Sequence, residues 1–236
     1  VTLRAEGNTD YFDGYSYQNY GQGGTVDTAP GRGGTGGAGT GGRVSLTVNG
    51  GDLIDLPDDP SGYQTNLTVT LSAVGQGGQG GDIYQYGSGG SSSNADLFTG
   101  DGGAAQGGTV ELTIGAGRFD ATTTLLDSSA HGGLPGDFSS YYYGSGGAGG
   151  AFGGGGRGGD ATGGTATLTI ESDFTSRTLD GKLQTFSVNA DGIGQSGLSG
   201  TSGGDGGDGQ GGSATIDIIG GNVTLFSPYL SAEGDG

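Results

Sequence analysis

An all-β fold is predicted by three features of this chain: a strand motif that occurs four times, a second motif between its copies, and a scarcity of helix-forming residues. The strand motif is a Gly-Gly pair followed by six residues with apolar side chains at every second position, as in 163–170, GGTATLTI. This period of two is typical of a strand with one buried face. The other copies are 41–48, 107–114 and 211–218. We therefore predict a repeat protein, a parallel β-solenoid of about four irregular repeats.

The second motif, an apolar or small residue followed by x-Ala-x-Gly, marks the length of each unit. Its alanines are 68, 57, 60 and 42 residues apart (73−5, 130−73, 190−130, 232−190), at Ala5, Ala73, Ala130, Ala190 and Ala232. Such differences usually map to loops while the strands stay in phase. We predict a single repetitive domain over 1–236, with units of approximately 1–65, 66–121, 122–182 and 183–236.

The charged residues indicate that almost no helix is present. Of the 25 acidic residues, 21 are Asp and four are Glu, and Lys occurs once. Asp favours turns, whereas Glu and Lys favour helices.

The strand around each Ala-x-Gly motif, for example 67–71, LTVTL, gives a second wall per unit, so that two walls face each other across a narrow core. One repeat cannot bury its own apolar face, so we expect equivalent residues of successive units to stack in ladders. The ladders of the Gly-Gly strands would be Val44, Val110, Ala166 and Ala214; Leu46, Leu112, Leu168 and Ile216; and Val48, Ile114, Ile170 and Ile218. The alternative fold is a β-sandwich that serves as a filament subunit.

Long glycine tracts with a period of three lie between the strands, at 33–38, 77–82, 146–159 and 203–208. A polyproline-II helix also has three residues per turn, so a Gly-Gly-x tract in this conformation has two of its three edges free of Cβ atoms. Such helices can approach one another closely and hydrogen-bond to their neighbours. We predict ordered, polyglycine-II-like tracts, and the alternative is flexible linkers.

Composition excludes several functional classes. A formal net charge of −18 with seven Lys and Arg residues opposes nucleic-acid binding. The absence of Cys excludes disulfides, thiolate zinc sites and thiol catalysis. No apolar run approaches the roughly 20 residues needed to span a bilayer, so we predict no membrane insertion.

Calcium is the one ion for which the sequence offers candidate ligands. The calcium-binding nonapeptide Gly-Gly-x-Gly-x-Asp-x-U-x matches at 77–84, and weaker matches begin at Gly155 and Gly203. The mechanism requires consecutive copies, whereas these are isolated and Gly-Gly-x arrays produce the pattern by chance. Calcium is therefore possible, no other cofactor is predicted, and the candidate ligands are Asp82, Asp160, Asp205 and Asp208.

No catalytic site is predicted, and we expect a protein that is not an enzyme. His131 is the only histidine, and nothing marks an acid–base pair among the many Asp residues. Tyrosines cluster within 11–20, 84–86 and 141–143, beside or within glycine-rich segments. They would either stack on sugars or fill the space between glycine helices.

The Gly-Gly-Thr-Ala-Thr-Leu-Thr-Ile strand and the Gly-Gly-x tracts resemble large glycine-rich repetitive exoproteins of bacteria, of the adhesin and extracellular-fibre group with β-solenoid stalks. The triplet tracts separately look like the polyglycine-II bundles of glycine-rich antifreeze proteins and of some phage tip adhesins. The resemblance implies a secreted or cell-surface location and transfers no functional residue.

We expect a structural subunit or segment of a secreted or cell-surface fibre whose partner is another copy of itself. An open strand edge is an aggregation hazard unless assembly uses it. The predicted joining edges lie near the two termini, at Val1, Leu3, Ala5, Leu225, Leu230 and Ala232. The alternatives are a glycan-binding adhesin module of a phage tip or bacterial surface, and an ice-binding protein, which would need regular Thr-x-Thr rows on every turn.

Overall fold

The computed structural model of the chain describes residues 1–5, 31–54, 67–87, 97–142, 154–176, 178–179, 182–198 and 203–236. These residues form strands and no helices, which confirms the predicted all-β class. Within them, the only antiparallel strand pair is β19 (Thr178–Leu179) with β20 (Lys182–Leu183). Parallel sheets fit the predicted solenoid and not a sandwich of the usual antiparallel kind.

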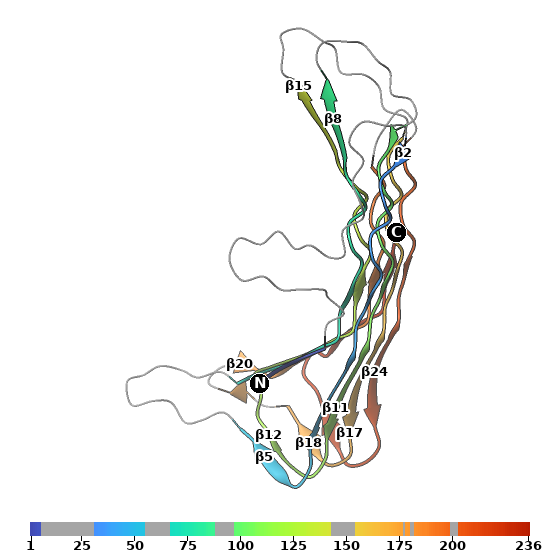
Figure 1. The fold of residues 1–236 in the computed structure, drawn as a ribbon. Coiled ribbons are helices and arrows are strands. Elements are labelled where there is room, and N and C mark those ends of the chain that lie inside the picture. The colour runs from blue at the N-terminus through green and yellow to red at the C-terminus, as the bar shows by residue number, and fades with distance from the viewer. Residues whose placement is uncertain are drawn as a thin grey trace, which may run out of the picture.

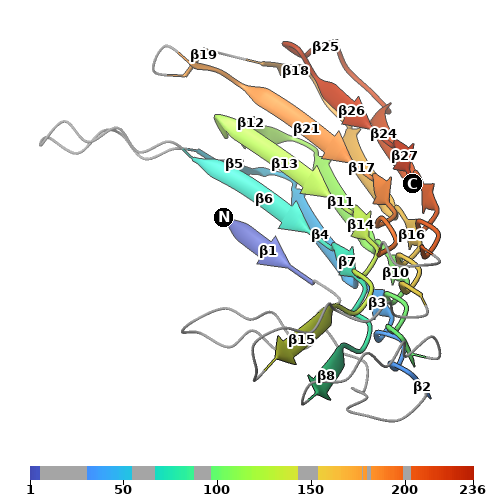
Figure 2. The same cartoon turned by 90° about the horizontal axis from the view of Figure 1, so that it is seen from above.

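Two parallel sheets form the walls of the fold. The first wall contains five strands, β1 (Thr2–Arg4), β6 (Thr68–Ser72), β13 (Thr123–Asp127), β21 (Thr185–Asn189) and β26 (Tyr229–Ser231). The second wall contains four, β4 (Arg43–Val48), β11 (Thr109–Ile114), β17 (Thr165–Ile170) and β24 (Ser213–Ile218). The chain alternates between the walls, and we call a first-wall strand with the second-wall strand that follows it one turn. β1 and β26 lie at opposite ends of the stack (Figure 2).

The ladders predicted for the second wall are present in register. Leu112 pairs with Leu46 on one side and with Leu168 on the other, and Leu168 pairs with Ile216. The first wall is aligned in the same way, with one file of inward residues formed by Leu3, Leu71, Leu126, Val188 and Leu230.

Where the two walls converge, they continue into two sheets of two-residue strands. One sheet holds β7 (Gly75–Gln76), β14 (Ala130–His131), β22 (Gly192–Ile193) and β27 (Gly234–Asp235), and the other holds β3 (Gly39–Thr40), β10 (Ala105–Gln106), β16 (Ala161–Thr162) and β23 (Gly209–Gln210). We call these sheets and the glycine tracts that adjoin them the glycine layer. The remaining strands pair two by two: β2 (Gly31–Arg32) with β9 (Leu97–Phe98), β5 (Gly51–Leu53) with β12 (Gly117–Phe119), β8 (Ile83–Gly87) with β15 (Phe138–Tyr142), and β18 (Phe174–Thr175) with β25 (Val223–Thr224).

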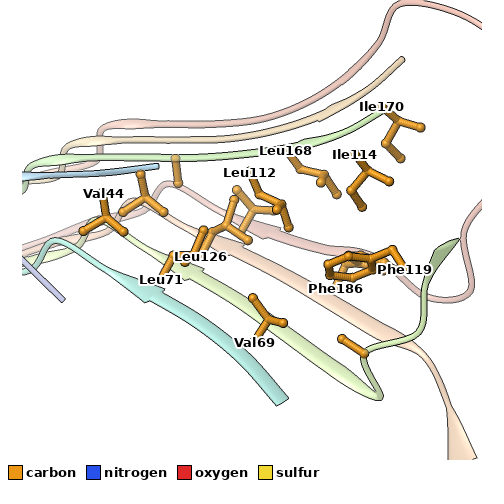
Figure 3. Packing of buried hydrophobic residues seen from close by; sticks show 14 of the residues in the cluster. Val44, Val69, Leu71, Leu112, Ile114, Phe119, Leu126, Leu168, Ile170 and Phe186 are labelled. Carbon is orange, nitrogen blue, oxygen red and sulfur yellow. The ribbon is translucent and has the colours of Figure 1, made fainter. Parts of the chain in front are cut away.

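The core is a wedge whose width follows the size of the inward side chains. The walls diverge from the glycine layer toward β5, β12 and β18 (Figure 1). Along 163–170, Gly163 comes first, where a Cβ atom would lie 1.9 Å from the carbonyl oxygen of Ala190 in the opposite wall. The inward residues Ala166, Leu168 and Ile170 follow, and each is 0% exposed. At the wide end, the rings of Phe119 and Phe186 stack with centroids 6.2 Å apart (Figure 3). Larger side chains thus fill the interior as the walls separate.

In the glycine layer the two backbones touch. A Cβ atom at Gly39 in β3 would lie 1.8 Å from the carbonyl oxygen of Gln76 in β7 of the facing sheet, which leaves no room for any side chain. In 77–82, the first Gly of each triplet donates its amide to the next turn, and the second donates across the layer. These bonds run from Gly77 N to His131 O, Gly80 N to Leu134 O, Gly78 N to Gly37 O, and Gly81 N to Gly34 O. The third residue of the triplet is half-buried and carries the side chain.

Three buried hydroxyls of the described residues have no hydrogen-bond partner, those of Thr122, Thr124 and Ser176, and we consider Thr124 in the first wall. Thr124 pairs with Val69 and Phe186 in the first wall and is 0% exposed. Its Oγ1 has no hydrogen-bond partner. A buried hydroxyl without a partner loses its hydration and gains nothing in return.

We predict that Thr124→Val, which has nearly the same shape, raises the free energy of unfolding by about 1 kcal/mol and Tm by about 2–4 °C. Thermal unfolding followed by circular dichroism measures the change. Thr123→Val is the matched control, since Thr123 is exposed on the same strand and its replacement should leave Tm nearly unchanged. A lower Tm for Thr124→Val would contradict this account of the core.

Two adjacent glycines test the contact between backbones. A Cβ at Gly207 would lie 2.1 Å from Gly159 O, whereas at Gly206 the nearest atom would be 3.8 Å away. We expect Gly207→Ala to lower the free energy of unfolding by roughly 1–3 kcal/mol or more, because the two adjacent turns of the sheet must separate. Gly206→Ala should change it by less than about 1 kcal/mol. Thermal melts of both variants at dilute concentration measure the difference, and equal effects would refute it.

Candidate assembly surfaces

The two ends of the stack expose apolar residues that are buried elsewhere in the same files. In the outermost file of the second wall, Ile114 and Ile170 are 2% and 0% exposed, but Ile218 on the last strand is 52% exposed. In the first wall, Leu71 is 0% exposed, while Leu230 on the last strand is 45% exposed. Equivalent residues differ only because no further strand of the described chain covers β24 and β26.

We define two end surfaces from these strands. The C-terminal end surface consists of β23, β24, β26 and β27 with the tract 203–208, and the N-terminal end surface consists of β1, β3 and β4 with the tract 33–38. Val1 and Leu3 are 51% and 37% exposed on the N-terminal end surface. Both surfaces are therefore partly apolar, as the ends of an uncovered core are expected to be.

The backbone of the C-terminal end surface presents amide donors. In the turn before, Gly158 N and Gly163 N donate to Asp205 O and Gln210 O. The register of β16 and β23 makes Gly206 and Gly211 the equivalents of these two donors one turn later. Neither amide has an acceptor in the described part of the chain.

The N-terminal end surface presents the matching acceptors. Gly36 N donates to Asp101 O, and Thr35 is the equivalent of Asp101 one turn earlier. Thr35 O receives no hydrogen bond from the described residues. Parallel stacking thus leaves free donors at one end and free acceptors at the other, in the same register.

Two glycines on the C-terminal end surface have room for a Cβ atom, whereas their equivalents in the turn before do not. A Cβ at Gly155 would lie 1.8 Å from Leu198 O, and one at Gly158 would lie 1.6 Å from Gln195 O. The equivalents one turn later are Gly203, with nothing within 4 Å, and Gly206. The Gly-Gly-x pattern therefore continues on this surface, although no described residue lies close enough to the first glycine of each triplet to exclude a side chain there.

The predicted edge residues lie on the two end surfaces or at the core beside them. Val1, Leu3 and Leu230 are exposed, as is Ala232. Ala5 and Leu225 are half-buried and pack against the core cluster. Ile218 was predicted as a ladder residue. Its exposure depends on which strand is last in the stack, and the repeat pattern does not predict which strand that is.

The four candidate calcium ligands have protein partners. Asp160 and Asp208 both face Arg157, at Nη2–Oδ distances of 2.7 and 3.4 Å. Asp82 Oδ1 accepts the amide of Asp137 at 2.8 Å. Asp205 contributes its carbonyl oxygen to the stack. Among the described residues, no group of three or more His, Asp or Glu side chains could hold a metal ion, and calcium binding stays a prediction.

The outward face of the second wall is rich in Thr without forming complete rows. Thr47, Thr113 and Thr169 stand side by side, and the row ends in Asp217. Other positions of the same face carry Arg43 and Glu111, which form an ion pair at 2.7 Å. The regular rows that ice binding would need are interrupted by these charges.

The tyrosine clusters fall largely outside the described residues. Residues 11–20 and Tyr143 are not described, and for the other two clusters the structure gives backbone pairing alone, with Tyr86 opposite Tyr141. In the described ranges, no helix has the length and hydrophobicity needed to cross a membrane.

Comparison with known proteins finds no match to this chain among protein-family models, curated proteins or solved structures.

Proposed function

We propose that this chain is the structural subunit of a fibre in which copies stack head to tail, each contributing about four turns of a parallel β-solenoid with polyglycine-II-like tracts. The observation that carries the proposal is the complementarity of the two end surfaces. Amides at one end and carbonyls at the other have no partner among the described residues, and they fall in the register used between turns within the chain.

The exposed apolar residues at the ends of the two walls also favour a second copy of the chain as the partner. Docking of a second copy would bring Val48 of that copy beside Ile218, as Val48 lies beside Ile114 within one chain. Ile218 and Leu230 would then be covered as their equivalents in the inner turns are covered. Removing apolar surface from water drives such an association.

The glycine tracts support close stacking rather than binding through side chains. Within the chain, a Cβ at Gly158 would lie 3.0 Å from Gly207 N of the next turn. Gly37 of a second copy would occupy the corresponding place above Gly206. An open glycine at this position keeps the end surface flat enough for another glycine layer to dock.

We also propose that the fibre is extracellular or displayed at a cell surface and has no enzymatic activity. Its support is the composition: no Cys, one His and a formal net charge of −18. Such a charge keeps the lateral surfaces of neighbouring fibres apart and hydrated. At moderate salt, screening over about 8–10 Å reduces the repulsion between copies that meet end to end.

A pair of adjacent isoleucines tests the fibre. We expect the purified chain to form filaments in negative-stain micrographs and to sediment at micromolar concentration in moderate salt. Ile218→Lys should abolish both signals, because the joint would bury a charge. Ile219→Lys should retain them, since Ile219 follows β24 on the opposite face, aligned with exposed Glu171.

The two variants should unfold at the same temperature, because both isoleucines are exposed in the single chain. A wild-type chain that stays monomeric at every concentration and salt would refute the fibre. Filaments that survive Ile218→Lys would refute the proposed joint.

A further inference from the structure

The two walls contain different numbers of strands, and this difference limits how two copies can join. The first wall has five strands and the second has four. β1 precedes β4, and β26 follows β24, so the first wall extends one strand beyond the second at the C-terminal end surface. This inference rests on the proposed fibre and concerns the structure of its joint.

Two joints are possible. If β4 of an incoming copy pairs directly with β24, then β1 of that copy falls on the position that β26 already occupies. If β1 instead pairs with β26, the second wall has a gap one strand wide beside Ile218. The first joint needs one strand to leave, and the second leaves apolar core and backbone amides uncovered.

We propose that the joint forms by strand exchange: β26 and β27 of one copy replace β1 of the next copy, which is displaced. The second wall and the glycine layer then continue without a gap. This is donor-strand addition to a sheet edge, with main-chain hydrogen bonds supplying affinity and inward side chains supplying register.

The two competing segments are chemically equivalent. Both have the sequence Leu-x-Ala-Glu-Gly, at 3–7 and 230–234. Leu3 and Leu230 belong to the same inward file, so Leu230 would face Leu71 of the next copy as Leu3 does in the single chain. The exchange therefore keeps the pattern of buried side chains.

One amide would change its acceptor in the exchange. Gly42 N donates to Ala5 O at 2.6 Å in the single chain. In later turns the equivalent bonds run from Gly108 N to Ala73 O and from Gly212 N to Ala190 O. Continuing this series, Gly42 N of the incoming copy would donate to Ala232 O.

β1 is the segment that leaves, because all three of its residues are exposed, whereas Ser231 of the competing strand β26 is buried. The competing segment continues into β27, which pairs with β22. Ser231 Oγ donates to Asp191 Oδ1 at 2.6 Å, and Glu233 N donates to the same atom at 2.9 Å.

Cysteine pairs distinguish the two joints, since the natural chain has no Cys. Tyr229 is the equivalent of Thr2, which lies beside Thr70. Strand exchange would place Tyr229 beside Thr70 of the next copy, whereas simple stacking would place it beside Thr2. Within one copy, Tyr229 and Thr70 are three strand spacings apart, about 14 Å, so a disulfide between them must join two copies.

We expect oxidised filaments of Thr70→Cys/Tyr229→Cys to give a ladder of covalent multimers on denaturing gels. Thr2→Cys/Tyr229→Cys and each single-cysteine variant should give no ladder beyond dimers. A ladder from the Thr2→Cys/Tyr229→Cys filaments alone would overturn strand exchange and leave the fibre intact. A wild-type chain that forms no filament would overturn the fibre itself.

A second measurement does not depend on engineered cysteines. A synthetic peptide of residues 226–236 should shorten wild-type filaments, because it fills the position of β1 and blocks the next copy. The same peptide with Leu230→Asp is the control and should have no effect. Deletion of residues 1–5 should shorten the lag of assembly severalfold, and an unchanged or longer lag would contradict the displacement of β1.

Discussion

Direct contact between backbones in the glycine layer is the constraint on which the rest of this structure depends. Carbonyl oxygens of one sheet occupy the space where Cβ atoms of the other would stand, as Gln76 O does at Gly39. The amides are used in two directions, toward the next turn and across the layer. Glycine loses more conformational entropy on ordering than any other residue, so a layer of this kind is stable only if nearly every backbone group finds a partner.

The glycine layer also determines how the apolar core is built. The two walls start from a separation too small for any side chain and diverge, which is why Ala, Leu and Ile follow Gly in order along 163–170. Each core residue is covered by the equivalent residue of the adjacent turns. A chain in which glycine supplies 63 of 236 residues acquires a dry interior because its few apolar residues are concentrated at the strands.

The repeat pattern predicted the all-β class, the parallel pairing and the ladder of Leu46, Leu112, Leu168 and Ile216, because equivalent residues share one face of a strand. The repeat pattern did not predict which residues are exposed at the two ends of the stack. Whether Ile218 is covered depends on the number of strands in each wall, and a periodic sequence does not specify which copy is last. Nor did spacing identify Arg157 as a partner of Asp208, because that contact crosses from one turn to the next.

The difference in strand number between the walls has a further consequence for control of assembly. A solenoid whose walls ended at the same level could add a copy by simple contact, and nothing would oppose growth at either end. In the proposed fibre, β1 of each single chain occupies the place that the neighbouring copy would enter. The single chain would then protect one edge of its first wall with its own strand, and elongation would require that strand to be exchanged for one with the same inward Leu and the same backbone bonds. Because the bonds lost and gained would be nearly equal, the exchange would change the rate of growth more than its free energy. The free energy would come from the second wall and the glycine layer, which gain a neighbour without losing one.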